Sequence, residues 1–169
     1  MMTTEKEELN IQNSFPPDTR IWIYQSATIL NAQQKSEIET KASIFIDDWT
    51  AHGKKLKATI EVFYNLFVVV FADEKQALAS GCSIDKSLKF IQSLESELNT
   101  SLLDRMQVAY LEKDEIKTLH LHKFAEEIKD KKISPDVKVF NNLIQTKAQL
   151  VNNWLVPITE SWHNNVVTK

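Results

Sequence analysis

The sequence predicts an α+β fold built on a ferredoxin-like βαββαβ unit. Segments with the two-residue alternation of strands and segments with helical spacing follow in the order strand, helix, strand, strand, helix, strand. The run LFVVVFAD at 66–73 is apolar on both faces, which is typical of a central strand. We therefore expect a four-stranded antiparallel sheet with both helices on one face.

The first strand and helix are predicted from alternation and from a capping pattern. RIWIYQS at 20–26 alternates in the manner of a strand. Asn31 followed by Gln34 forms the pattern of a capping box, so a helix should begin there. TAHGK at 50–54 should end this helix, with Gly53 as its left-handed C-terminal residue. The apolar face of the helix should hold Ile38, Ala42, Phe45, Ile46 and Trp49.

The second half of the unit begins with a hairpin. LKATIEVFY at 56–64 alternates and leads into the 66–73 strand through a short turn near Asn65. Ser83 is a good N-cap for the second helix. RMQVAYL at 105–111 should be the fourth strand. The buried stripe of the second helix should hold Ile84, Leu88, Ile91, Leu94 and Leu98.

The pattern divides the chain into three parts. Residues 1–18 are a polar, flexible leader that ends at two prolines, 19–112 are the ferredoxin-like domain, and 113–169 are a small subdomain. The second face of the apolar strand must also be covered, by the C-terminal segment or by a second subunit. The expected C-terminal elements are a strand at 115–121, a helix at 122–132, an extended run at 137–144 and a helix starting at 147.

Composition excludes several classes of protein. The net charge of -3 and the pI of about 5.8 argue against a nucleic-acid binder. The sequence contains no apolar run of bilayer length and no export signal, and its single cysteine suits a reducing cytoplasm. Gly53 and Gly81 are the only glycines, so neither a P-loop nor a dinucleotide fingerprint can form. We expect no cofactor.

The expected topology brings several polar residues to one end of the sheet. The loop after the first helix and the loop before the second helix should both lie where the first strand starts. Trp49, His52 and Lys54 should therefore lie near Cys82, Ser83 and Asp85. Arg20 should begin the first strand at this end, and Tyr110 should finish the fourth strand there.

Two chemical interpretations suit this end. Cys82 could be a nucleophile with His52 as its base, because a helix start and an imidazole both favour the thiolate form of a cysteine. Alternatively, the backbone N–H groups of Ser83, Ile84 and Asp85 could bind a small ligand, helped by the basic residues. In the plain interpretation, Cys82 fills a tight turn and His52 is solvated. His120 and His122 could begin a metal site, but no third ligand lies near, so we predict no metal.

Three strings carry a family resemblance: WTAHGK, FADEKQALASGCSIDKS and LLDRMQVAY. With them, residues 19–163 resemble a bacterial family of unknown activity whose members are often labelled "ABC transporter ATPase". The missing P-loop does not fit that label. The resemblance implies no activity or site residue.

A second resemblance lies in LHKFAEEIKDKKISPDVKVFNNL and the following Trp154. This part is similar to bacterial GYF-like modules, in which a helix, a Ser-Pro-Asp turn, a strand and a tryptophan recur. The glycine that precedes this turn in those modules and the Gly-Tyr-Phe signature are both absent here. The resemblance therefore implies a structure more than the binding of proline-rich peptides.

The sequence thus favours a cytoplasmic ligand-binding or protein-interaction module with an unknown small ligand or protein partner. The first alternative is a cysteine-dependent enzyme using Cys82 and His52. The second is a structural homodimer that pairs through the open face of the sheet.

Overall fold

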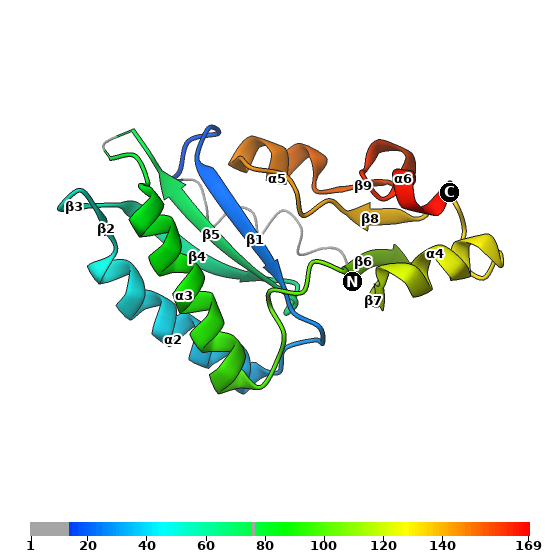
Figure 1. Ribbon diagram of the computed structural model, residues 1–169, viewed down its shortest axis with the longest axis horizontal. Coiled ribbons are helices and arrows are strands. Elements are labelled where there is room, and N and C mark those ends of the chain that lie inside the picture. Colours follow the sequence, from blue (N-terminus) through cyan, green and yellow to red (C-terminus); the bar gives the residue numbers. More distant parts are fainter. Residues whose placement is uncertain (1–13, 76) are drawn as a thin grey trace.

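A computed structural model describes residues 14–75 and 77–169 of the chain. Within these residues, the protein is a mixed α+β structure with one antiparallel sheet of three strands and another of four. Figure 1 shows α2 and α3 against the three-stranded sheet, with the four-stranded sheet and α4 in the other half of the molecule. The predicted α+β class is confirmed.

The first sheet has the order β1-β5-β4 and is antiparallel throughout. Its central strand β5 is buried at every position, as its apolar sequence predicts. Tyr64 and Asn65 both have positive φ, at 55° and 51°, and form the tight turn of the predicted hairpin between β4 and β5. The strands are β1 (Arg20–Gln25), β4 (Lys57–Phe63) and β5 (Phe67–Asp73).

The helix α2 (Ala32–Asp48) begins as predicted. Asn31 and Gln34 form both hydrogen bonds of a capping box. The helix ends earlier than expected, because Trp49 is already extended and starts the hairpin of β2 (Thr50–Ala51) and β3 (Lys54–Lys55). Gly53 is left-handed, with φ of 76°, but it lies in this hairpin turn beside His52 and does not cap the helix.

The helix α3 (Gly81–Leu98) begins three residues before the position that the sequence suggests. Its N-cap is Ser80, whose hydroxyl oxygen accepts a hydrogen bond from the Ser83 backbone N–H at 3.1 Å. The prediction of Ser83 as N-cap is therefore wrong. Ser83 lies inside the first turn and is buried.

The predicted fourth strand lies in a different sheet. β6 pairs with β7 along six residues and with β8, in the order β7-β6-β8-β9. Lys113 and Asp114 both have positive φ, at 51° and 63°, so a two-residue hairpin turn joins β6 directly to β7. This local pairing occupies β6, and the four-stranded ferredoxin-like sheet is not confirmed. The strands are β6 (Gln107–Glu112), β7 (Glu115–His120), β8 (Lys138–Phe140) and β9 (Leu155–Pro157).

Short helices complete the C-terminal half. The predicted turn at 134–136 is present, since the Val137 backbone N–H donates to the Ser134 carbonyl oxygen at 3.1 Å. The helix that follows β7 is strongly amphipathic and buries Phe124. The remaining elements are α4 (Leu121–Lys129), α5 (Lys147–Asn153), η2 (Ile158–Glu160) and α6 (Asn164–Val167).

The C-terminal segment covers the second face of the first sheet. Phe140, Ile144, Leu150 and Trp154 pack against this face in one buried cluster. The same cluster includes Phe15, which is 8% exposed, so the described end of the expected leader is packed. Residues 1–13 lie outside the described residues. The other face packs on α2 and α3.

Candidate functional site

The end of the first sheet that the sequence singles out is assembled largely as expected. The Trp49 indole N–H donates to the Ser83 carbonyl oxygen at 2.8 Å, and both residues are buried. This hydrogen bond joins the end of α2 to the first turn of α3. His52 and Lys54 follow Trp49 in the β2–β3 hairpin, and β2 contacts α3, the helix that begins with Cys82, Ser83 and Asp85 in its first turns.

Cys82 and His52, the two residues expected to do chemistry, lie on the surface, and within the described residues no hydrogen bond or ion pair joins them. The backbone N–H groups of Ser83 and Ile84 are already bonded to Ser80. The predicted cradle of N–H groups is therefore largely occupied by the cap of its own helix.

Two of the charged residues at this end, Asp85 and Arg20, also have partners. Asp85 pairs with Lys89 one helical turn later, with both side chains mostly exposed. Arg20 pairs with Glu74 at 3.2 Å, and its guanidinium lies over the Trp22 ring at 4.6 Å. Exposed pairs of this kind contribute little to stability.

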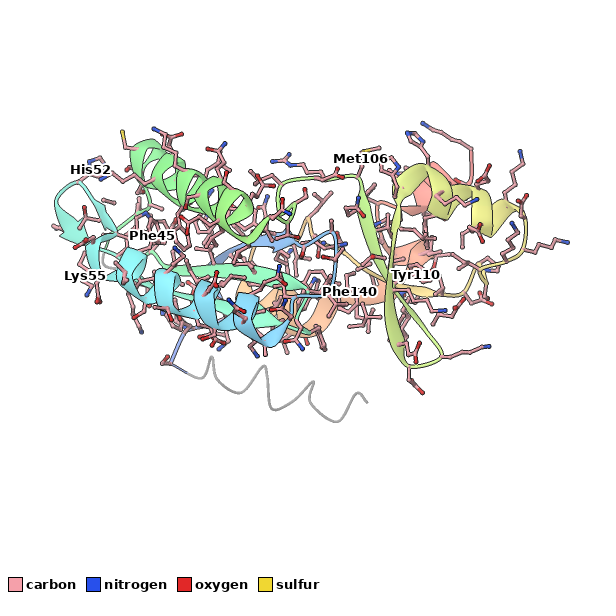
Figure 2. All side chains as sticks on the ribbon, turned by 90° about the horizontal axis from the view of Figure 1, so that it is seen from below. Phe45, His52, Lys55, Met106, Tyr110 and Phe140 are labelled. Atoms are coloured by element: carbon pink, nitrogen blue, oxygen red, sulfur yellow. The ribbon has the colours of Figure 1, made fainter. Side chains whose placement is uncertain are left out.

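Tyr110 lies in the other half of the molecule. It belongs to β6 and packs against Phe124, with 5.2 Å between ring centroids. Figure 2 shows it far from His52. Burial, together with Glu112, raises the pKa of Tyr110. The expectation that Tyr110 joins the predicted site is wrong, because β6 pairs with β7 and β8.

His120 and His122 lie at a helix start. The rings are 5.3 Å apart, and His120 caps α4 by accepting from the His122 backbone N–H at 3.4 Å. Among the residues that the structure describes, no group of three or more His, Cys, Asp or Glu side chains could hold a metal ion.

A concave feature lies elsewhere, along the outer edge of β1. This cavity of about 450 Å³, here named the β1 cleft, separates the two sheets. Its floor is β1, and its walls come from α3, from the segment 102–107, from the segment 140–145 and from Trp162 and His163. The volume is within the range of ligand sites in proteins, about 300–1,000 Å³.

The β1 cleft occupies the position that the fourth strand was expected to fill. Ile84 and Leu88 belong to the predicted buried stripe of α3, and both line this cavity. Leu88 is 36% exposed, whereas Ile91 and Leu94 in the same stripe are fully buried on the sheet. The apolar stripe of α3 thus continues past the edge of the sheet and over the vacant position.

The backbone of β1 has an open edge in this cleft. The Ile21 N–H donates to the Gln145 carbonyl oxygen, on the side away from β5. Since alternate residues of a strand point to the same side, the N–H and C=O of Ile23 also point away from β5. Within the described part of the chain, these two groups have no hydrogen-bond partner.

A buried side-chain donor lies next to this edge. Trp154 Nε1–H donates to Asn142 Oδ1, and Asn142 Nδ2–H donates to Gln25 Oε1, each at 2.9 Å. Because an indole N–H can only donate, this chain fixes the orientation of both amides. Gln25 Nε2 is then left as a donor with no partner among the described residues, although Gln25 is only 6% exposed and lines the cleft.

The far wall of the cleft contains a buried imidazole. His163 stacks on Trp162 with 3.9 Å between ring centroids, and its Nδ1 lies 2.7 Å from the Ser161 hydroxyl. Burial lowers the pKa of His163 from 6.5 to about 4. The ring is therefore neutral at pH 7 and adds a hydrogen-bonding group without charge.

Sequence reasoning missed the β1 cleft because it placed a strand there. One signal was present: the hairpin from β6 into EIKTLHL at 115–121 could have been read from the sequence. The Gln25 side chain carries no comparable signal, since its role depends on residues more than a hundred positions away.

Comparisons with known proteins return no match: neither a family model, nor a curated protein, nor a solved structure is similar to this chain. Within residues 14–75 and 77–169, no helix has both the length and the apolar character needed to cross a bilayer.

Proposed function

We propose that this protein is a binding module without catalytic chemistry, and that its ligand occupies the β1 cleft. The observation that carries this proposal is Gln25, which lines a cavity of ligand size and whose buried amide donor has no partner within residues 14–75 and 77–169. A buried donor that lacks a partner costs about 1–3 kcal/mol, and a ligand acceptor would recover this energy. The apolar side chains beside it would supply the area for binding.

This proposal moves the site away from the His52–Cys82 end of the sheet. That end supports binding less well, because Ser80 caps the helix and Asp85 is paired.

We further propose that residues 20–98 are a ferredoxin-like unit without its fourth strand. We also propose that the C-terminal half is GYF-like, and the order of α4, the 134–136 turn, β8 and Trp154 supports this proposal.

The test is a screen of a small-molecule fragment library by ¹H–¹⁵N NMR on the full-length protein. We expect fragments to shift the Gln25 side-chain amide and the backbone amides of β1. Leu143→Lys, on the cleft wall, should weaken their binding at least about tenfold. Ile44→Lys is the matched control, since Ile44 is equally exposed, at 64% against 62%, on α2 outside the cleft. Fragments that shift only residues outside the β1 cleft would refute this assignment.

A cysteine-dependent enzyme is the second candidate, with Cys82 as nucleophile and His52 as base. One observation favours it: Cys82 is exposed in the first turn of α3, where a substrate could reach the thiol. Alkylation of Cys82 by iodoacetamide at pH 7 tests it. A base at His52 predicts that His52→Ala slows alkylation at least about tenfold, whereas a binding module predicts rates within about twofold.

The third candidate is a structural homodimer. The sheet face that it would use is filled by the C-terminal segment. Dimerisation would therefore need another surface, and light scattering that gives the mass of one chain would exclude it.

The expected location is the cytoplasm, on the basis of the single cysteine.

A further inference from the structure

We propose that the β1 cleft binds an extended apolar segment of a partner protein, which adds to the first sheet as its fourth strand. This inference rests on the proposed function, and it names the class of ligand. It is argued from the backbone of β1, from the walls of the cleft and from the Gln25 amide.

The open part of the β1 edge is short and bounded at both ends. Near Arg20, the edge is closed by the Ile21–Gln145 bond and by a bond from the Lys147 N–H to the Thr19 carbonyl oxygen. Beyond Gln25, the Ala27 N–H donates to the Ser101 carbonyl oxygen at 3.0 Å. About four residues of added strand, or roughly 13 Å, fit between these closures.

The unpaired groups within this opening match a strand. The N–H and C=O of Ile23 form a donor and acceptor pair on one side of the chain, which a residue on an adjacent strand satisfies with two hydrogen bonds. Gln25, two residues further on, lines the same cleft, and its buried amide donor has no partner among the described residues. A peptide carbonyl group is the acceptor that an added strand would bring to it.

The walls determine the side chains that the strand should carry. Ile84 and Leu88 line the cleft from α3, and Phe140 and Ile144 line it from the C-terminal segment. An added strand would thus have apolar walls on both of its faces, as a central strand does. Arg105 borders the cleft, is exposed and has no ion pair within the described residues, so an acidic residue beside the apolar ones would suit it.

A second copy of the chain does not fit this edge. Strands in a sheet lie about 4.8 Å apart. The β1 edge forms the floor of a cleft, so the same walls would hold the edges of two copies further apart than this distance. A linear segment can enter where another folded sheet cannot.

The test begins with a phage-displayed library of random linear peptides, selected on the full-length protein. We expect peptides with three or four consecutive apolar, β-branched residues. The best synthetic peptide is then N-methylated at one backbone amide at a time, and affinities are measured by calorimetry. Methylation at the alternate positions that face β1 should weaken binding at least about tenfold, and methylation at the intervening positions should change it by about twofold or less.

A variant tests the contribution of Gln25. Gln25→Glu keeps the oxygen that accepts from Asn142 but loses the amide donor, so it should lower the affinity for the peptide at least about tenfold. Gln92→Glu adds the same charge at an exposed position of α3 that does not line the cleft, and it is the matched control. The methylation series uses the wild-type protein, so it remains decisive if Gln25→Glu fails to fold.

The outcomes separate the two proposals. Equal effects of methylation at every position, or failure of the library to yield a peptide that binds this cleft, would overturn strand addition. If fragments still bind in the cleft in that case, the proposed binding function stands. If neither probe binds there, both proposals fail.

Discussion

The buried imidazole of His163 should make the stability of the protein depend on pH. Its pKa is about 4 in the folded protein, against an ordinary value of 6.5, and burial is the cause. The unfolded chain therefore binds the proton more tightly, so the free energy of unfolding falls as the pH decreases from about 7 toward 4. The full shift corresponds to about 3 kcal/mol, of which about 2 kcal/mol should be lost between pH 8 and pH 5.

The assay is urea unfolding of the wild type and of His163→Asn at pH 8, 7, 6 and 5. Asparagine can keep a hydrogen bond to the Ser161 hydroxyl, but it does not titrate. The variant should be less stable at pH 8 and should lose about 2 kcal/mol less than the wild type on the way to pH 5. Equal pH dependence in the two proteins would show that His163 is not the buried, neutral group described above.

Two further predictions concern the backbone and the first core. Gly53→Ala should destabilise the protein by about 1 kcal/mol, because φ is 76° there, whereas Gly81→Ala should be neutral or stabilising, since its new Cβ meets no atom within 4 Å. Urea unfolding compares the pair, and the reverse order would contradict it. Trp49→Phe should cost about 2 kcal/mol through the lost bond to Ser83 and the lost volume, and an unchanged melting temperature would refute that anchoring role.

The local elements could be predicted because their causes lie within a few residues. The capping box of Asn31 and Gln34 and the buried strand at 66–73 are each visible in a short stretch of sequence. The hairpin around Asn65 and the helical stripe of Ile91 and Leu94 follow from the same kind of pattern. Such patterns identify a segment as a helix, a strand or a turn, and they were sufficient to predict the α+β class.

Local patterns of this kind do not show which neighbour a strand pairs with. The alternation at 105–111 identifies β6, but it does not determine which edge β6 joins. The two-residue turn at Lys113 and Asp114 lets β7 pair with β6 at a small loss of chain entropy. Pairing with β1 would close a far longer loop. The incorrect position of Tyr110 follows directly from this incorrect partner.

The two candidate sites also differ in whether local sequence patterns can predict them. The His52–Cys82 end could be predicted because helix direction and loop position determine it, and the Trp49–Ser83 bond confirms that the two loops meet. The β1 cleft arises from a strand that is missing, and the unpaired amide of Gln25 arises from its contact with Asn142, 117 positions away. No pattern within a window of sequence shows either feature.

Amide hydrogen exchange along β1 tests the open edge most directly. Trp22 and Tyr24 point their N–H groups toward β5, so these amides should exchange only through large unfolding events. The Ile23 amide, between them, should exchange at least about a hundredfold faster in the free protein. Equal protection of Ile23 and its two neighbours would mean that another strand already occupies the edge, and the account of the β1 cleft would be wrong.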